Sequence, residues 1–319
     1  MKIRKTCIVT GGAGFIGSHL CQALLANDCS VYCLDNLLTG NLNNIKSLEN
    51  DQSFRFYKID VTKPLDEKLI KDDKIDLIYH LASPASPPQY RRFAIETLLV
   101  NSVGTYNMLQ LAKKNKARFL LASTSEVYGD PKEHPQKETY FGNVNPVGIR
   151  ACYDESKRFA EALTMEFNRK NKLAVRIVRI FNTYGPNMQA DDGRVISNFI
   201  TQAISYKPLT VYGSGRQTRS FCYVSDMVSG LIKVMEGEKT NGQIVNLGNP
   251  DEIKIIDLAN LILKLTGSSS KVVKLNKRLQ DDPEKRKPDI SLAEKLIAFN
   301  PEVSLTEGLK NTIAYFRNL

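Results

Sequence analysis

Tyr153 and Lys157 are a pair whose residue types and spacing could do acid–base chemistry. They stand four residues apart in "ACYDESKR", so a helix would place them on one face. A nearby lysine cation lowers the pKa of a phenol from its ordinary value of about 10, which lets the phenol accept a proton closer to neutral pH. The pair therefore predicts a tyrosine base, supported by a lysine, that acts on a hydroxyl group.

A second group of polar side chains lies in the segment "LLASTSEVYGD", residues 120–130, which begins as the end of an apolar run. Ser123, Thr124, Ser125 and Glu126 follow the apolar run directly, which predicts a reaction centre at the carboxyl end of a buried strand. Two interpretations of Glu126 stay open. It is either a general acid or base, worth roughly 10²–10⁴ in rate, or a carboxylate that fixes the bound molecule or the loop.

The segment "IVTGGAGFIGSHL" carries Gly11, Gly14 and Gly17 between an expected strand and an expected helix. Small residues at this spacing let the backbone turn tightly and aim helix N–H groups at a pyrophosphate. Asp35 ends the next expected strand 18 residues after Gly17, where a carboxylate can bind the ribose hydroxyls of adenosine and repel a 2′-phosphate. The pattern favours NAD over NADP; a structural turn with an incidental aspartate is the alternative.

Two further strand ends complete the expected cofactor site. Asp60 and Val61 end the third strand, where the edge of an adenine would lie. Leu81, Ala82 and Ser83 end the fourth strand, beneath the expected position of the pyrophosphate. Both positions follow from the rule that ligands bind at the carboxyl ends of parallel strands.

The elements that must position these residues alternate between strand and helix. Apolar, β-branched runs at residues 7–11, 31–35, 54–60, 76–82, 118–124 and 174–180 predict parallel strands, and helices are expected at 17–26, 94–114 and 150–170. This pattern predicts an α/β fold with a doubly wound parallel sheet, a Rossmann fold. Residues 1–181 would form the NAD-binding domain. Residues 182–319 would mainly form a smaller, C-terminal substrate-binding lobe, with part of 220–248 returning to the sheet.

Composition excludes several classes of function. The 319 residues carry a formal charge of +10, which suits an anionic ligand but also fits scattered surface lysines, and no basic stripe with stacking aromatics indicates nucleic-acid binding. Six cysteines without zinc-type pairing predict buried free thiols, and three distant histidines argue against a metal site. No signal peptide precedes the first expected strand and no apolar run approaches ~18 residues, so we expect a cytoplasmic enzyme without a membrane partner.

The chain resembles the extended short-chain dehydrogenase/reductase family over nearly its whole length, and within it the UDP-glucuronate decarboxylases. Seven segments in order carry this resemblance: "YHLASPASPP", "LASTSEVYGDP", "NPVGIRACYDESKR", "RIFNTYGPNM", "DDGRVISNFI", "LTVYGSGRQTRSFCYVSD" and "DDPEKRKPDI". It implies NAD as cofactor, UDP-glucuronate as substrate, and catalytic roles for Thr124, Glu126, Tyr153 and Lys157. The residues that would bind NAD are Gly11, Gly14, Phe15, Ile16, Gly17, Asp35, Asn36, Thr39, Gly40, Asp60, Val61, Leu81, Ala82, Ser83, Tyr153 and Lys157. Those that would bind the nucleotide sugar are Ser125, Asn182, Arg194, Tyr212, Arg219 and Arg286.

The reaction that the resemblance implies is decarboxylation to UDP-xylose. Direct loss of CO₂ would leave an unstabilised carbanion at C5, whereas oxidation of C4 places a ketone β to the carboxylate and lets an enolate form. Ser125 supports this reaction, because related 4,6-dehydratases carry there an aspartate that protonates the departing 6-hydroxyl. The alternatives are an oxidative decarboxylase that releases the UDP-4-ketopentose and NADH, a UDP-sugar 4-epimerase, and a non-catalytic NAD-sensing protein.

The sequence departs from the decarboxylase pattern at several positions. Leu99 stands where a lysine that contacts substrate is usual, Ser156 stands where glycine is common, and residues 91–93 differ from the usual loop. These departures concern substrate details more than the class of reaction. The resemblance also implies a homodimer built from helices 94–114 and 150–170, although core packing explains their apolar faces equally well.

Overall fold

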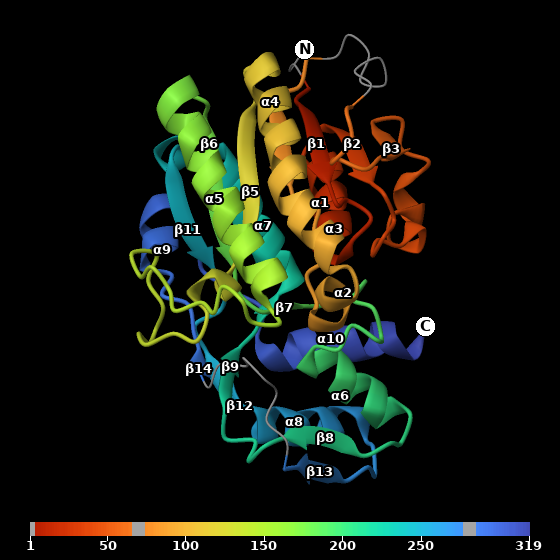
Figure 1. The fold of residues 1–319 in the computed structure, drawn as a ribbon. Coiled ribbons are helices and arrows are strands. Elements are labelled where there is room, and N and C mark those ends of the chain that lie inside the picture. The colour runs from red at the N-terminus through yellow and green to blue at the C-terminus, as the bar shows by residue number, and fades with distance from the viewer. Residues whose placement is uncertain (1–3, 66–73, 277–284) are drawn as a thin grey trace.

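A seven-stranded parallel sheet forms the centre of the molecule (Figure 1). The structure, a computed structural model, describes residues 4–65, 74–276 and 285–319. The predicted doubly wound sheet is confirmed, with the strand order β11-β6-β5-β4-β1-β2-β3. Its strands are β1 Thr6–Thr10, β2 Ser30–Asp35, β3 Phe54–Lys58, β4 Leu77–His80, β5 Arg118–Thr124, β6 Val175–Ile180 and β11 Gln243–Leu247.

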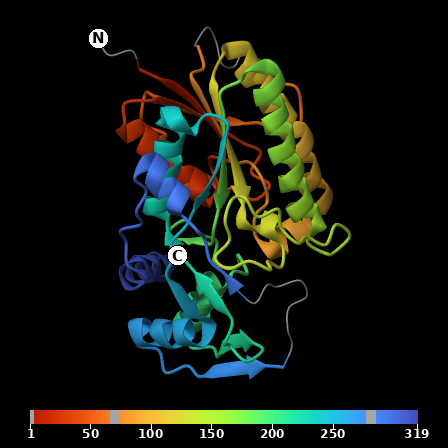
Figure 2. The same cartoon turned by 90° about the vertical axis from the view of Figure 1, so that its left-hand side faces the viewer.

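Helices cover both faces of the sheet, because alternate residues of each strand point to opposite sides. Cys7 and Val9 of β1 belong to one core, together with residues of α1 (Phe15–Ala26) and α7 (Val224–Glu236). Ile8 belongs to a second core with residues of α4 (Thr105–Asn115) and α5 (Ala151–Asn171). Figures 1 and 2 show these two helical layers on either side of the strands. The central strands β1, β2 and β4 are therefore almost entirely buried, as expected for a sheet covered on both faces.

The segment expected as one helix over residues 94–114 has a more complex path. It consists of α3 (Ala94–Leu99), a π-helical turn at Val100–Gly104, and α4. Within the π turn the fully buried Asn101 donates to the carbonyl of Thr97 and to the hydroxyls of Ser83 and Ser156, at 3.0–3.1 Å. A π turn adds one residue to a helical turn, and here it brings an amide to the end of β4.

After β6 the chain leaves the sheet and builds a lobe below the carboxyl ends of the strands (Figure 1). The lobe has its own apolar core, drawn mainly from α6 (Val195–Ile204), β8 (Leu209–Tyr212), α8 (Ile255–Thr266) and α10 (Leu305–Arg317). Between these segments α7 and β11 run back to the sheet, and β11 pairs with β6. Short elements complete the lobe and its junction: β7 Thr183–Tyr184, β9 Thr218–Ser220, β10 Cys222–Tyr223, β12 Glu252–Lys254, β13 Val272–Leu275 and β14 Lys285–Arg286. The helix α9, Ser291–Ile297, instead packs on β11 and α7 and contributes Ala293 to a core of the sheet domain.

Three remaining predictions concern the chain as a whole. All six cysteines are free thiols, and five of them are buried. Within the described ranges, the helices lack the length and apolar character that crossing a bilayer requires. The charged segment of residues 277–290, whose composition predicts a solvated loop, lies outside the described residues up to position 284; from there it forms β14 at Lys285–Arg286.

Candidate active site

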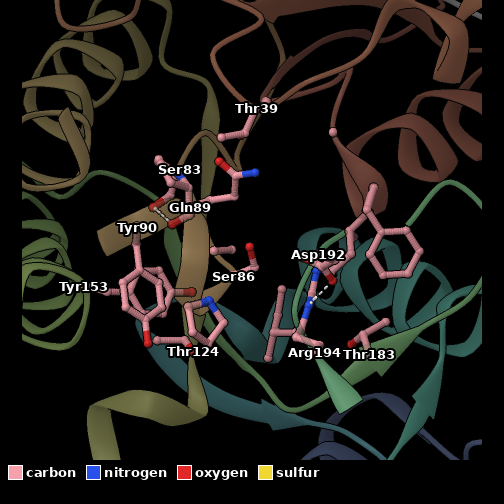
Figure 3. A pocket seen from close by; sticks show the side chains of 18 of the residues that line it. Thr39, Ser83, Ser86, Gln89, Tyr90, Thr124, Tyr153, Thr183, Asp192 and Arg194 are labelled. Atoms are coloured by element: carbon pink, nitrogen blue, oxygen red, sulfur yellow. Dashed lines mark hydrogen bonds and ion pairs between the residues drawn. The ribbon is translucent and has the colours of Figure 1, made fainter. Parts of the chain in front are cut away.

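A cavity of about 610 Å³ lies between the carboxyl ends of the sheet and the lobe. Every residue expected to bind cofactor or substrate, or to take part in catalysis, lines it. Figure 3 shows Thr124 and Tyr153 on one side of this cavity and Asp192 and Arg194 on the other. Residues more than 150 positions apart in the chain, such as Asp35 and Arg219, thus meet in one space.

The glycine-rich turn has no room for larger side chains. Gly11 has a φ of +70°, and a Cβ built on it would lie 2.9 Å from the Cα of Ala82 at the end of β4. A Cβ on Gly17 would lie 2.1 Å from the carbonyl oxygen of Gly11, so α1 packs directly on the turn. The amino terminus of α1, which lacks a side-chain cap, faces the cavity at Phe15. This arrangement fits a pyrophosphate held by backbone N–H groups.

Asp35 fits the ribose end of the same cofactor. Its carboxylate accepts from the backbone N–H of Ala13 (3.0 Å) and of Leu37 (2.8 Å), and these bonds fix its direction at the end of β2. Burial raises its pKa, while the two N–H groups act against that rise. A Cβ on Gly40 would lie 2.7 Å from the carboxylate, so the loop after β2 closes tightly around it. The residues present therefore fit NAD, with a carboxylate where NADP would place a phosphate.

Tyr153 lies on α5 beside the end of β5. Its ring stacks on that of Tyr90, with 5.0 Å between centroids and an interplanar angle of 3°, and its hydroxyl is hydrogen-bonded with Thr124. The Nζ atom of Lys157 lies 5.9 Å from the Tyr153 ring centroid and donates to the carbonyl of Ala122 at 2.8 Å. The expected group of hydroxyl, phenol and ammonium is thus assembled.

The electrostatics of this pair differ from the expectation. Burial raises the pKa of Tyr153 to about 12, and the hydrogen bond with Thr124 acts in the opposite direction. Burial also lowers the pKa of Lys157 to about 7, against the attraction of Glu161. The lowered phenol pKa predicted from the spacing is therefore not found in the protein alone, because burial of the Tyr153 phenol disfavours its charged form.

The three hydroxyl residues that follow the apolar run of β5 have different roles: one helps to hold the fold together, and the others belong to the active site. Ser123 donates to Glu161 at 2.6 Å, and the same carboxylate forms a buried salt bridge with Arg179 at 2.8 Å, so Ser123 also helps to hold α5 on the sheet. The Thr124 hydroxyl accepts from the backbone N–H of Glu126 at 3.2 Å and begins the 3₁₀ turn Ser125–Tyr128. This turn directs the chain along the cavity, so that Thr124, Ser125 and Glu126 all line it.

Glu126 is held between two arginines. Oε1 accepts from Nη1 of Arg286 on β14, and Oε2 accepts from Nη2 of Arg150, the residue before α5. Burial opposes ionisation of this carboxyl, but attraction from Arg150, Arg286 and Arg219 prevails and lowers its pKa. Glu126 is therefore an anion at neutral pH. Sequence reasoning missed Arg150, since a single basic residue ahead of a helix carries no recognisable signal.

The lobe contributes the remaining positive charge. Arg194, at the start of α6, forms an ion pair with Asp192 and lies with Cζ 5.9 Å from the Phe15 ring centroid. Arg219 on β9 is mostly buried, with 8% of its surface exposed, and lines the cavity with Tyr212 and Asn182. These positions fit an anionic ligand that spans the two parts of the molecule.

Two hydroxyls that the sequence analysis did not select also line the cavity. The side-chain oxygens of Ser86 and Tyr90 are buried and have no hydrogen-bond partner among the described residues. Figure 3 shows Tyr90 lying over Tyr153, with Ser86 nearby. Leu99, one of the departures noted above, lines the same cavity with 45% of its surface exposed. Leu99 therefore supplies no charge to the cavity.

Comparisons with known proteins agree with this geometry. Residues 7–248 match the NAD dependent epimerase/dehydratase family. UDP-glucuronic acid decarboxylase 4 of Arabidopsis thaliana is 51% identical over 310 residues, which cover 97% of this chain and 68% of that protein. UDP-glucuronic acid decarboxylase 1 of Xenopus tropicalis is 51% identical over 316 residues, which cover 99% of this chain and 73% of that protein.

Solved structures show the same fold. The UDP-glucuronic acid 4-epimerase of Bacillus cereus, in complex with UDP-glucuronic acid and NAD, superposes with a TM-score of 0.88 at 32% identity, covering 98% of this chain and 99% of that one. An epimerase of Methanothermobacter thermautotrophicus superposes with a TM-score of 0.91 at 29% identity, covering 99% of this chain and 93% of that one. The chain belongs to the NAD dependent epimerase/dehydratase family, and the two curated relatives described above are UDP-glucuronic acid decarboxylases.

Proposed function

We propose that this protein is an NAD-dependent UDP-glucuronate decarboxylase, which converts UDP-glucuronate to UDP-xylose through a transient 4-keto sugar. The observation that carries the proposal is the single cavity that joins three features. These are the dinucleotide turn, the group formed by Thr124, Tyr153 and Lys157, and the Glu126 carboxylate between its arginines. The curated relatives at about 51% identity support the same reaction.

The first step is removal of a proton from the C4 hydroxyl of the sugar. Tyr153 accepts this proton, Thr124 holds the reacting oxygen through its hydroxyl, and Lys157 supports the charge that develops on the phenol. The glycine turn and Asp35 would hold NAD, which would supply a hydride acceptor for C4 and a hydride donor once CO₂ has left. A stacked ring that is 95% buried keeps the phenol in one place and away from bulk water.

The second step is loss of the carboxylate. A ketone at C4 lies β to that carboxylate, so the electrons of the breaking bond flow into an enolate, and C5 is then protonated. Ser125 cannot act as an acid at neutral pH, which excludes the departure of a 6-hydroxyl by the dehydratase route. Glu126 lies beside Ser125 and is anionic; we assign it to C5, where it organises a proton or a water molecule.

The nucleotide sugar requires cationic groups for its diphosphate. Arg194, Arg219 and Arg286 all line the cavity from the lobe or its junction with the sheet. An arginine fork matches the geometry of phosphate oxygens. We assign Arg194 and Arg219 to the diphosphate, and Asn182 and Tyr212 to the rest of the nucleotide sugar. Arg286 already donates to Glu126 and to the carbonyl of Gly129, so we assign it to the sugar beside Glu126.

The decisive experiment incubates the purified protein with UDP-glucuronate and follows the product mass together with the absorbance of reduced nicotinamide. Loss of one CO₂ without net reduction of NAD supports the proposal. Stoichiometric reduced NAD would instead indicate an oxidative decarboxylase that releases the UDP-4-ketopentose. An unchanged mass would indicate a 4-epimerase, a candidate favoured by the likeness to the Bacillus cereus enzyme.

A homodimer is the assembly that the surface supports. Large apolar side chains are exposed in a stripe along α3, the π turn and α4, and Phe159 is exposed on the neighbouring α5. Exposed large apolar side chains that follow one helical segment favour an interaction site, and a two-fold axis would pair this segment with its copy. Sedimentation of wild type and of a Leu98→Glu variant tests this: the variant should sediment as a monomer. The stripe consists of Ile95, Leu98, Leu99, Val103 and Tyr106.

A further inference from the structure

Arg150 is built into the cavity between the two groups that act on the sugar. It stands directly before α5, and its carbonyl accepts from the backbone N–H groups of Tyr153 (2.9 Å) and Asp154 (3.0 Å). Its side chain is 12% exposed, and Nη2 donates to Oε2 of Glu126. Arg150 therefore touches Glu126 with its side chain and begins the helix that carries Tyr153.

The two arginines around Glu126 come from different parts of the molecule. Arg286 belongs to β14 at the edge of the lobe, and it also donates to the carbonyl of Gly129 at 2.8 Å. Arg150 belongs to the sheet domain, and its Nε lies 3.9 Å from Oδ2 of Asp154 one helical turn further on. Arg286 thus ties Glu126 to the lobe, whereas Arg150 ties it to α5.

We propose that Arg150 is a positioning residue, which fixes Glu126 at C5 relative to Tyr153 at C4. This inference rests on the proposed decarboxylase function. C4 and C5 are adjacent carbons of one sugar ring, and Tyr153 acts on the first while Glu126 acts on the second. The distance between these two side chains therefore has to stay constant during the reaction. A contact between Glu126 and Arg150, the residue directly before the helix of Tyr153, does this, whereas a contact with the lobe moves whenever the lobe moves.

Loss of the Arg150 side chain should affect the later steps of the reaction. Thr124, Tyr153 and Lys157 keep their contacts with one another, so C4 is still oxidised. Glu126 is then held by Arg286 alone from the lobe side, and protonation of C5 slows. Reduced nicotinamide should consequently accumulate during a single turnover.

The test is a double-mutant cycle on the full-length protein with bound NAD, using Arg150→Met, Glu126→Gln and the double variant. Arg150→Met should lower kcat by about 100-fold, as expected for a misplacement of 1 Å, with KM for UDP-glucuronate changed by no more than about threefold. The double variant should be no slower than Glu126→Gln, because Arg150 acts through that carboxylate. Losses that multiply, or normal turnover in either single variant, would overturn the inference.

Two further variants keep the result interpretable. Arg158→Met is the matched control, because Arg158 is also on α5 and donates to the carbonyls of Val127 and Phe141, at 3.2 and 2.7 Å, outside the cavity. It should retain kcat and accumulate no reduced nicotinamide. If Arg150→Met does not fold, Arg150→Lys in both backgrounds completes the cycle with the same criterion. A wild-type protein that releases no CO₂ would refute the proposed function, whereas an active wild type with an equally active Arg150→Met refutes this inference alone.

Discussion

Replacing Tyr153 by phenylalanine should separate catalysis from folding. The change removes the phenol oxygen and keeps the ring, which stacks on Tyr90 at 5.0 Å and 3°. Without that oxygen the hydrogen bond with Thr124 cannot form, and such a bond contributes about 1 kcal/mol to the free energy of unfolding. The rate should fall by roughly 10²–10⁴, which corresponds to about 3–5 kcal/mol in the activation free energy. The effect on the reaction therefore exceeds the effect on stability.

The assay measures kcat from UDP-xylose formation, the midpoint of thermal unfolding, and the Kd for NAD on the same preparations. Tyr153→Phe should bind NAD like the wild type and unfold within a few degrees of it. Tyr206→Phe is the control, because Tyr206 is 73% exposed and lies outside the cavity. Turnover within tenfold of wild type would remove Tyr153 from the role of base. Parallel losses of NAD binding and stability would show that the ring, and not the oxygen, was needed.

Three further predictions follow from the cofactor turn and from α5. Gly17→Ala should weaken NAD binding and lower the midpoint of thermal unfolding. The new Cβ would lie 2.1 Å from the carbonyl oxygen of Gly11, and this clash outweighs the gain of about 1 kcal/mol in helix propensity. A higher midpoint with unchanged NAD affinity would contradict this. Asp35→Asn should reduce the preference for NAD over NADP by at least about tenfold, or about 1.4 kcal/mol, measured by titration with both nucleotides; an unchanged ratio would exclude Asp35 from this discrimination. Burial raises the pKa of Asp154 from 3.8 to about 7. Between these two pH values the folded protein keeps a proton that the unfolded chain loses, so the free energy of unfolding should fall as pH rises from about 4 to about 7. Comparing unfolding midpoints of wild type and Asp154→Asn across this range checks the sign, and parallel curves would refute it.

Local patterns were sufficient to predict the sheet and the cofactor turn. Gly11, Gly14 and Gly17 stand within one short segment, and each strand is marked in the sequence by its own run of apolar residues, whichever strand it pairs with. The same holds for Asp35, whose carboxylate is fixed by the backbone of its own turn and of the neighbouring one. Features of this kind can be recognised in a sequence because the residues that create them are close together.

Features that depend on distant segments could not be predicted in this way. The pairing of Glu126 with Arg150 and Arg286 joins three elements, and a lone arginine in a sequence gives no indication of its partner. The π turn at Asn101 was expected as ordinary helix, because no residue type in the segment 94–114 marks the place where one turn gains a residue. The pKa of Tyr153 was also expected to fall, because spacing reveals a neighbouring lysine but not the burial that raises the pKa instead.

The return of the chain to the sheet through β11 limits how the molecule can be divided. β11 pairs with β6 in parallel along its whole length, from Gln243 opposite Arg176 to Leu247 opposite Ile180. A fragment that stopped after β6 would expose an unpaired strand edge, which is a template for association with other chains. Gene fragments cut at that point should consequently yield aggregates, and a chimaera that exchanges the lobe needs junctions on both sides of α7 and β11.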